Sequence, residues 1–439
     1  MIQITTNLTF GQKIKKARLE KNFTQSELVG DFITRNMLSK IENDAANPSL
    51  KTIEYLAYKL EKPISYFLDN SLTIDNKKKN NIELAFEHSA YLFKNKEYSN
   101  CIDYIENLLE EYDRSIDKII YPRTLSILGR CYIHVDKLDS ALKAIEECIK
   151  LLDINKDHYY LIVSYLNLSY IYFNSNQFVK SENSSRKAIE ILNNSPIDSE
   201  LIELKLYYVL GYSLYKQLKY NEAIPPLLYS LEISKEYDCF YNVGSIHMLL
   251  GIVYEKNNSI RKAIFHTQKS ITFFDFSEKL ELKWASQINL GNHYIKNGDY
   301  EEAKLCLYEC LKYYEQINNL LKVNTIKTDI IEVLTKECKY MDAIDYSKKI
   351  DIDIIKDTDR ASIFKNLGKC YISSNKLVEA ESYLHKALEI LKENERLDII
   401  YDTLTFLAEL YSLAGDFKKA YEFSNKSKEI LEKSSRDNK

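Results

Sequence analysis

One pattern of small and aromatic residues recurs along most of the chain, with a period of about 40 residues. Each copy has a small residue, a Tyr or Leu three positions later, an aromatic or aliphatic residue six further on, and a second small residue three beyond that. The clearest copies span 128–141, 250–263, 290–303, 367–380 and 407–420. The second small residues of the clear and weak copies are Cys101, Ala141, Ser181, Ala223, Ala263, Ala303, Ala343, Ala380 and Ala420. A period of this length predicts a repeat array.

Paired helices explain why the pattern needs small residues at two places. The first small residue lets two antiparallel helices approach, the aromatic residue fills the space between them, and the second small residue packs the pair against its neighbour. The chain has 10 Gly and 6 Pro in 439 residues, which disfavours turn-rich β folds and glycine-loop nucleotide-binding folds. The order of residues resembles tetratricopeptide repeats, about six residues longer than the usual 34, and HEAT-like pairs are the competing interpretation. We therefore predict an all-α chain in which residues 82–435 form a right-handed α-solenoid of about nine helix pairs.

Residues 1–68 have a different pattern, that of five short helices. Thr24, Thr34 and Ser49 are suited to cap the second, third and fourth helices, and Pro63 ends the fourth. The apolar residues expected to face inward include Phe10, Ile14, Ala17, Leu28, Phe32, Leu38 and Ile41.

This segment resembles the Cro/C1-type (XRE) helix-turn-helix family over residues 11–68. The matching residues are Arg18, Thr24-Gln25, Leu28, Ser39-Lys40-Ile41-Glu42, Pro48-Ser49-Leu50 and Ala57. The chain departs from the family at Asn43-Asp44, where a glycine often follows the Glu. The resemblance implies an internal ion pair between Arg18 and Glu42 and a third helix that enters the major groove.

The polar residues of that third helix are candidates to contact double-stranded DNA. Arg can hold guanine and Asn can hold adenine with two hydrogen bonds each, and a helix N-terminus suits a phosphate. The candidate DNA-binding residues are Thr24, Gln25, Thr34, Arg35, Asn36, Ser39 and Lys40. Proteins of this type bind two half-sites as dimers, so we expect a homodimer whose contact lies in the solenoid.

Other features of the sequence limit what the chain can do. Residues 69–81 (DNSLTIDNKKKNN) are polar and predict a linker between the two domains. The start of the chain lacks the apolar core of a signal peptide and no apolar run could span a membrane, so we expect a cytoplasmic protein with reduced cysteines. Cys101, Cys148 and Cys310 fall at small packing positions. We find no catalytic motif, metal set or cofactor motif, and predict that the chain is not an enzyme.

The inner face of the solenoid is the candidate ligand site. The first helix of each pair should line it, through the positions two before and one after the first small residue. These positions predict peptide-binding residues at Arg130, Asn167, Tyr170, Tyr212, Asn289, Asn292, Asn366 and Lys369. An Asn amide can both donate to and accept from a peptide backbone, and Arg suits a carboxylate. Ordinary polar surface residues are the competing interpretation.

The two domains together resemble the peptide-sensing quorum regulators of Gram-positive bacteria, the Rgg, Rap, NprR, PlcR and PrgX superfamily, and most closely NprR and PlcR. The resemblance implies a dimeric transcription factor that binds an operator and a short imported signalling peptide. Two other functions stay open: a Rap-like adaptor that binds a response regulator, and a constitutive repressor whose repeats only dimerise. The peptide, the operator and the sign of regulation are not encoded in these patterns.

Overall fold

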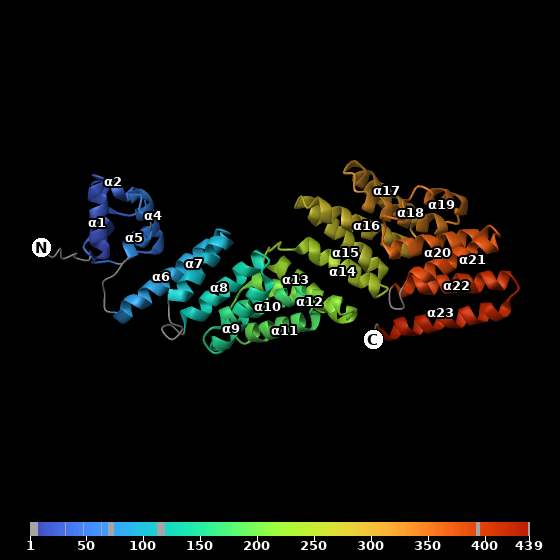
Figure 1. Cartoon of the computed structure of the whole chain (residues 1–439), viewed down its shortest axis with the longest axis horizontal. Helices are drawn as coiled ribbons and strands as arrows, with labels where there is room; N and C mark the ends of the chain where they lie inside the picture. The colour runs from blue at the N-terminus through green and yellow to red at the C-terminus, as the bar shows by residue number, and fades with distance from the viewer. Residues whose placement is uncertain are drawn as a thin grey trace. The chain divides into compact units, whose positions relative to one another are not determined.

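The computed structural model describes residues 8–30, 32–46, 48–62, 64–68, 74–111, 119–391 and 396–437. All regular structure in these ranges is α-helical, as predicted (Figure 1). The chain divides into two compact units. The first contains residues 1–175 and 187–197, and the second contains residues 176–186 and 198–439.

The five short helices predicted at the front of the chain are present. They are α1 (Phe10–Glu20), α2 (Gln25–Val29), α3 (Arg35–Glu42), α4 (Leu50–Leu60) and α5 (Ile64–Leu68). Thr24, Thr34 and Ser49 cap their helices through side-chain oxygens that accept backbone N–H groups. Ile14, Leu28, Leu38 and Ile41 are fully buried among these helices.

One inward position in this domain was predicted wrongly. Phe32 lies beyond the end of α2 and is 51% exposed, with its ring stacked on Tyr55 at 4.8 Å. The helix ends at Val29 because Gly30 follows with φ +50°, a left-handed conformation that glycine adopts without strain. Val29 is buried in place of Phe32.

A buried ion pair holds α3 against α1. The Arg18 Nε donates to Glu42 Oε1 at 2.5 Å and Nη2 donates to Oε2 at 3.0 Å, so the pair expected from the family resemblance is present. Arg18 Nη1 also donates to the carbonyl oxygen of Phe23 at 2.7 Å, and the Gln25 amide donates to Glu42 Oε2 at 2.8 Å. The hydrogen bonds to Glu42 raise the pKa of Arg18. One carboxylate at the end of α3 thus fixes both preceding helices.

The departure at Asn43-Asp44 has a structural role. Asp44 takes φ +56° and its carboxylate accepts from the Gly11 N–H at 2.8 Å and from the Thr9 hydroxyl at 2.5 Å. A Cβ at Gly11 would lie 2.2 Å from the carbonyl oxygen of Ile41, so only glycine allows this contact. The start of α1 is therefore bound to the end of α3.

Eighteen helices follow in the described ranges, the number expected for the nine helix pairs of the predicted solenoid. In chain order they are α6 (Ile74–Lys94) with α7 (Tyr98–Glu111), α8 (Ile120–His134) with α9 (Leu138–Leu151), α10 (His158–Asn174) with α11 (Phe178–Asn193), α12 (Glu200–Lys216) with α13 (Tyr220–Glu236), α14 (Val243–Lys256) with α15 (Ile260–Phe276), α16 (Leu280–Asn297) with α17 (Tyr300–Gln316), α18 (Leu320–Lys336) with α19 (Tyr340–Ser347), α20 (Asp357–Ser373) with α21 (Leu377–Ile390), and α22 (Leu397–Leu413) with α23 (Phe417–Asp437). Helix α6 begins at Ile74, so residues 74–81 of the predicted linker are helical, and residues 69–73 lie outside the described ranges.

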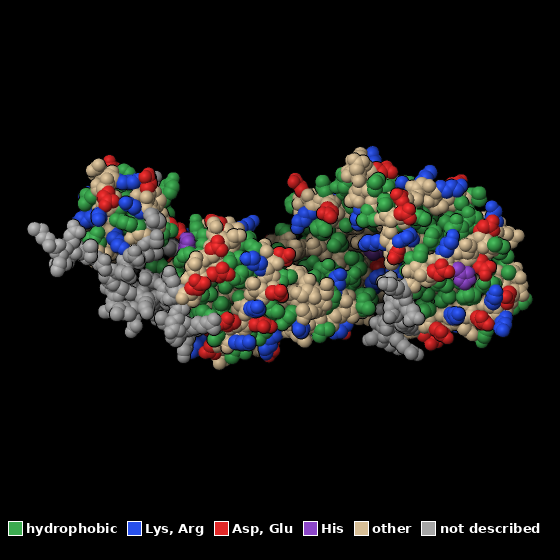
Figure 2. Space-filling model, in the orientation of Figure 1, with side chains coloured by type: hydrophobic (Ala, Val, Ile, Leu, Met, Phe, Trp, Pro, Cys, Tyr) green, Lys and Arg blue, Asp and Glu red, His purple; other side chains and the backbone are tan. Residues whose placement is uncertain are grey.

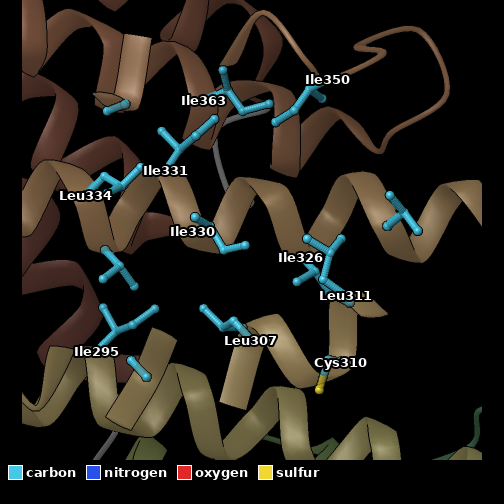
Figure 3. Packing of buried hydrophobic residues seen from close by; sticks show 14 of the residues in the cluster. Ile295, Leu307, Cys310, Leu311, Ile326, Ile330, Ile331, Leu334, Ile350 and Ile363 are labelled. Atoms are coloured by element: carbon cyan, nitrogen blue, oxygen red, sulfur yellow. The ribbon is translucent and has the colours of Figure 1, made fainter. Parts of the chain in front are cut away.

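Small residues let the helices of each pair approach. A Cβ on Gly129 would lie 2.4 Å from Ile145 of the second helix, and one on Gly368 would lie 2.5 Å from Leu384. The second small residues are fully buried from Cys101 through Ala380. Cys148 and Cys310, seven residues after such a position, are also fully buried, so all three cysteines occupy packing positions as expected. Figure 3 shows the resulting core over α16 to α20, where Leu307, Ile330 and Ile363 lie among other aliphatic side chains.

Removing the Glu42 carboxylate tests the buried ion pair. Glu42→Ala leaves the Arg18 guanidinium buried without its partner, and breaking a buried pair in this way costs roughly 3–5 kcal/mol. We expect amide hydrogen exchange in α1 to α3 to accelerate strongly in the full-length variant. Glu27→Ala, which removes only an exposed capping carboxylate, should have a much smaller effect. Equal protection in wild type and Glu42→Ala would contradict the role of this pair.

Three histidines of the second unit, His266 and His293 buried and His247 partly buried, are expected to make its stability depend on pH. Burial lowers the pKa of His247, His266 and His293 to about 4. His247 and His266 are joined by a 2.9 Å hydrogen bond between their Nδ1 atoms, in which one ring must accept and therefore be neutral. Because the unfolded state binds protons from about pH 6.5 downward and the folded state does not, stability should fall as the pH drops from about 6.5 towards 4, by up to ~3 kcal/mol for each histidine.

The measurement is the thermal unfolding midpoint between about pH 7 and about pH 5, a window above the ordinary carboxyl pKa values. His293→Leu should reduce the loss of stability over this window. The matched control is His385→Leu, since the His385 side chain is 43% exposed. If both variants lose stability with pH as steeply as wild type, burial of His293 is not the cause.

Candidate nucleic-acid interface and inner groove

Helix α3 presents a polar face to solvent. Arg35, Asn36 and Lys40 are exposed, and Ser39 is partly exposed, while Leu38 and Ile41 face the core. Thr34 is exposed and caps the helix by accepting the Met37 N–H at 3.2 Å. The face predicted to contact DNA is therefore free of contacts with the domain's core.

The residues at the start of α2 are less free than predicted. Thr24 accepts the Glu27 N–H at 3.2 Å, and Glu27 in turn accepts the Thr24 N–H at 2.7 Å, which completes a capping box. The Gln25 amide nitrogen donates to Glu42, so a phosphate contact by Gln25 would use the second hydrogen of that nitrogen or compete with the buried network.

The lysines near α1 are only partly available to an anion. Lys21 is paired with Glu61 at 2.8 Å, and Lys62 is paired with Glu20 at 3.2 Å. Lys15 and Lys16 are exposed. Two of these four lysines are thus already paired with carboxylates.

In the first unit, the inner-face positions hold a cation without an acidic partner. The Arg130 guanidinium lies over the Phe93 ring at 4.0 Å, and burial lowers its pKa. Within the described ranges no carboxylate forms an ion pair with Arg130. Asn167 has a buried Nδ2 without a hydrogen-bond partner among the described residues, and Tyr170 is partly buried. This combination favours a ligand that supplies a carboxylate and a carbonyl oxygen.

In the second unit, the predicted inner-face positions hold a tyrosine and several asparagine side chains. Tyr212 packs against Tyr208 and Tyr215 with ring centroids 5.9 and 6.1 Å away, and all three rings are partly buried. Asn289 and Asn292 are partly buried on α16. Asn366 is 2% exposed, and no described residue hydrogen bonds with its Nδ2.

Lys369 is already paired with a carboxylate, and its role in peptide binding stays a prediction. Its Nζ donates to both carboxylate oxygens of Glu409 at 2.7 Å. A ligand would have to compete with that ion pair for the cation. We therefore regard Lys369 as a structural link between α20 and α22.

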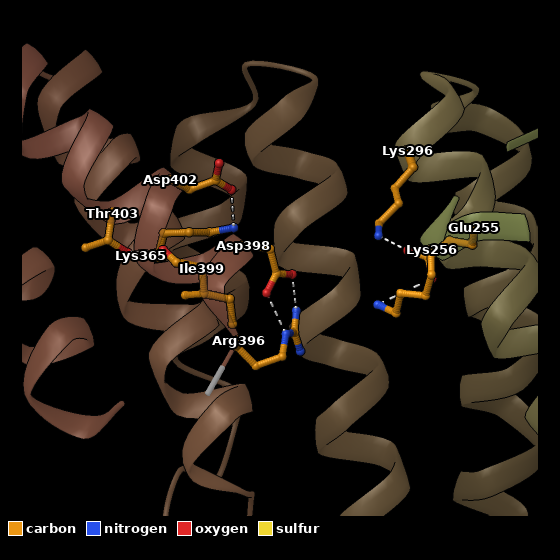
Figure 4. Close-up of polar contacts among 9 residues, drawn as sticks. All are labelled: Glu255, Lys256, Lys296, Lys365, Arg396, Asp398, Ile399, Asp402 and Thr403. Atoms are coloured by element: carbon orange, nitrogen blue, oxygen red, sulfur yellow. Dashed lines mark hydrogen bonds and ion pairs between the residues drawn. The ribbon is translucent and has the colours of Figure 1, made fainter. Parts of the chain in front are cut away.

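Charged side chains from distant repeats face each other across the inner side of this unit. Figure 4 shows Lys256 and Lys296 with Glu255 on one side, and Arg396 with Asp398 on the other. Burial disfavours the charge on Asp398, but its hydrogen bond with Arg396 and the charges of Arg396 and Lys256 lower its pKa to about 2. Figure 2 shows this unit hollowed on one face, with lysine or arginine side chains inside the hollow.

Sequence analysis missed two inner-face residues in the repeat of α18. Asp329 and Glu332 occupy the same two positions as Asn289 and Asn292, because Ile331 lies 12 residues before Ala343, as Gly291 lies 12 before Ala303. The sequence pattern of this copy is weak, because Ile331 replaces the first small residue that marks the clear copies. Counting back from Ala343 would have found both carboxylates.

The described helices include none long and apolar enough to cross a membrane. The described His, Cys, Asp and Glu side chains form no group that could hold a metal ion.

Three family models match parts of the chain. A helix-turn-helix model matches residues 14–67, a tetratricopeptide-repeat model matches residues 162–193, and a model named MAS20 protein import receptor matches residues 253–350. The first match coincides with α1 to α5, and the second lies in α10 and α11. The domain types predicted from the residue patterns are confirmed.

Two curated proteins are similar over parts of their length. A TPR repeat-containing protein of Methanocaldococcus jannaschii is 24% identical over 283 residues, which cover 59% of this chain and 47% of that protein. Response regulator aspartate phosphatase I of Bacillus subtilis is 26% identical over 114 residues, which cover 26% of this chain and 29% of that protein. The first alignment thus spans about half of its relative's length, and the second spans less than a third.

Two solved structures share the fold over most of the chain. The apo form of the quorum sensor NprR from B. thuringiensis is 14% identical with a TM-score of 0.53, and the match covers 80% of this chain and 99% of that chain. A Rap protein complexed with Competence and Sporulation Factor is 16% identical with a TM-score of 0.50, and the match covers 82% of this chain and 99% of that chain. The chain therefore contains a helix-turn-helix domain and tetratricopeptide repeats, and its fold is similar to the folds of the quorum sensor NprR and of the Rap protein.

Proposed function

We propose that the chain is a cytosolic, homodimeric transcriptional regulator that binds an operator with α3 and senses a short imported peptide on the inner face of its repeats. The observation that carries the proposal is the presence, in one chain, of an exposed polar recognition helix and of inner-face groups that lack partners. Arg35 and Asn36 are exposed on that helix, and the inner-face groups without a partner among the described residues are the Nδ2 atoms of Asn167 and Asn366.

The DNA contact follows from the chemistry of α3. The Arg35 guanidinium can donate two hydrogen bonds to a guanine in the major groove, and the Asn36 amide can pair with an adenine. Lys40 and the hydroxyls of Thr34 and Ser39 suit phosphate oxygens or further base edges. A single domain with so few base contacts binds weakly, and a second copy on a half-site one helical turn away supplies the missing affinity.

The peptide contact follows from the unsatisfied inner-face groups. A buried amide without a partner costs free energy, which a bound peptide recovers by supplying carbonyl oxygens. Arg130 suits the carboxylate because its guanidinium offers two parallel donors and has no acidic partner among the described residues. Asn167, Asn289, Asn292 and Asn366 suit an extended backbone, whose own hydrogen-bonding groups are unpaired. Tyr170 and Tyr212 would pack against its side chains.

The relatives support this choice of ligand by analogy of fold. NprR is named a quorum sensor, and the Rap protein was solved with Competence and Sporulation Factor. Binding of a peptide that favours one curvature of the solenoid would change the spacing of the two recognition helices in a dimer, which is a population shift between two states.

A second candidate function is that of an adaptor that binds a response regulator. It is favoured by the match to response regulator aspartate phosphatase I over 114 residues. Co-purification of a response regulator with the full-length chain, independent of DNA, would support the adaptor. A constitutive repressor, the third candidate, would bind its operator equally with and without peptide.

Replacing Arg35 tests the DNA contact. Arg35→Ala should weaken binding to the operator by roughly 1–3 kcal/mol and relax specificity at one base pair, because it removes two hydrogen bonds to one base. Fluorescence anisotropy with operator and single-base variants measures both effects. Arg261→Ala, an exposed arginine of α15, is the charge-matched control and should leave the affinity unchanged. Unchanged affinity and specificity in Arg35→Ala would show that α3 does not contact bases.

Replacing Asn366 tests the peptide groove. Asn366→Ala should weaken a bound peptide by roughly 1–3 kcal/mol, because a buried peptide carbonyl loses its donor. The probes are synthetic peptides that correspond to the C-termini of small secreted precursors encoded beside the gene. Calorimetry measures the affinity of each variant for these peptides. Asn221→Ala, which changes an exposed Asn of α13, is the matched control. Equal affinities for a peptide in both variants would remove Asn366 from the binding site.

A further inference from the structure

Two cysteines from neighbouring repeats lie in contact where the pair α6–α7 meets the pair α8–α9. Cys101 is on α7 and Cys131 is on α8, and both side chains are fully buried in one hydrophobic cluster. The Cys101 thiol donates to the carbonyl oxygen of Ser89 at 3.3 Å, and the Cys131 thiol is hydrogen bonded with the Cys101 sulfur. Neither thiol has a part in the proposed contacts with DNA or peptide.

The repeat register gives independent evidence that side chains at these two positions meet. Cys101 is the second small residue of its repeat, and Cys131 lies ten residues before the second small residue of the next repeat. Ser181 on α11 and Ser213 on α12 occupy the same two positions, and their hydroxyl oxygens are 2.8 Å apart. At this place in the repeat, the side chains of neighbouring helices therefore point toward each other.

Cys370 shows the same position without a second thiol. It lies ten residues before Ala380, but the second small residue of the preceding repeat is Ala343. The Cys370 sulfur instead lies 3.5 Å from the Thr335 hydroxyl. Burial at this position is thus common to both cysteines, whereas a facing thiol distinguishes Cys131.

The surroundings make Cys101 the more acidic thiol of the two. The hydrogen bond with Cys131 lowers the pKa of Cys101, while the same hydrogen bond and burial raise the pKa of Cys131. The positive charge of the adjacent Arg130 acts on Cys131 in the opposite direction and favours its thiolate. A thiolate is the form that attacks a peroxide or a sulfenic acid. Disulfides that occur in the cytosol are usually transient and either catalytic or redox-sensing.

We propose that Cys101 and Cys131 form a redox-sensitive dithiol, which a peroxide converts into a disulfide between α7 and α8. The Cys101 thiolate attacks one oxygen of hydrogen peroxide and becomes a sulfenic acid, and the hydroxide that leaves takes up the proton that Cys101 lost. Cys131 then gives up its proton and attacks the sulfenic sulfur, which forms the S–S bond and releases a second water. Two thiols are oxidised by two electrons, and one peroxide is reduced to two waters.

The disulfide joins the helix pair at the front of the solenoid covalently to the next pair. Both sulfurs are buried, so the peroxide reaches them during local openings of the helices, which are slower than the oxidation of an exposed thiol. The inference goes beyond the proposed function, because it gives the chain an oxidative input that depends on neither the peptide nor the operator.

The test is treatment of the full-length protein with hydrogen peroxide, followed by denaturation, alkylation and peptide mass mapping without a reductant. The parent protein carries Cys239→Ser and Cys338→Ser, which remove the thiols that are not buried. It should lose two of its six remaining thiols. The map should contain one pair of peptides linked through Cys101 and Cys131, two hydrogens lighter than the separate peptides. Dithiothreitol should restore both thiols.

Cys101→Ser and Cys131→Ser should each abolish the cross-link without impairing folding, because Ser181 and Ser213 already occupy this register in the folded chain. Cys370→Ser is the matched control and should leave the cross-link unchanged. Amide hydrogen exchange in α7 and α8 should slow by roughly tenfold or more after oxidation, because a disulfide restricts local opening. The same treatment should leave exchange unchanged in the Cys131→Ser protein.

Retention of both the Cys101 and the Cys131 thiols after prolonged treatment would overturn the proposal. It would also be overturned if the lost thiols were Cys306 and Cys310, which lie four residues apart on α17. Oxidation of Cys101 to a sulfinic acid without a cross-link would likewise contradict it, and so would a cross-link that leaves exchange in α7 and α8 unchanged.

Discussion

The close approach of paired helices is the constraint on which the solenoid depends. Where Gly129 or Gly368 lies against the second helix, a Cβ would fall within 2.5 Å of an Ile or Leu side chain. The same approach buries Ala141 and Ala380 completely and brings each pair against the next. Within each unit the inner helices repeat this spacing, so side chains two before and one after the small residue recur at equivalent places on successive inner helices. Packing in the core thus decides which polar groups occupy these places.

The two candidate sites use polar groups in opposite ways. At the front, the Glu42 carboxylate is fully satisfied by Arg18 and Gln25, and this rigid network leaves the outer face of α3 free for DNA. On the inner face of the repeats, Asn366 and Asp329 keep buried atoms without partners. A satisfied network stabilises the fold, whereas unsatisfied groups lower the stability of the free state and favour a bound one.

Sequence patterns predicted much of this because they record local physical rules. Helix caps at Thr24, Thr34 and Ser49 and the small-residue period were sufficient to predict the five front helices and nine pairs. The prediction failed for Phe32, because the chain turns at Gly30. Residues 74–81, part of the predicted linker, are helical because this polar segment is continuous with α6. Asp329 and Glu332 were missed because Ile331 interrupts the small-residue pattern while keeping the helix register.

The sequence by itself determined the fold class, the repeat register and the domain order, because periodicity and capping act between residues close in the chain. Only the tertiary structure decided which polar groups have partners. Lys369 is taken by Glu409, 40 residues away, while Arg130 meets an aromatic ring and no carboxylate among the described residues. Such pairings depend on distances between different helices, which no spacing along one helix records.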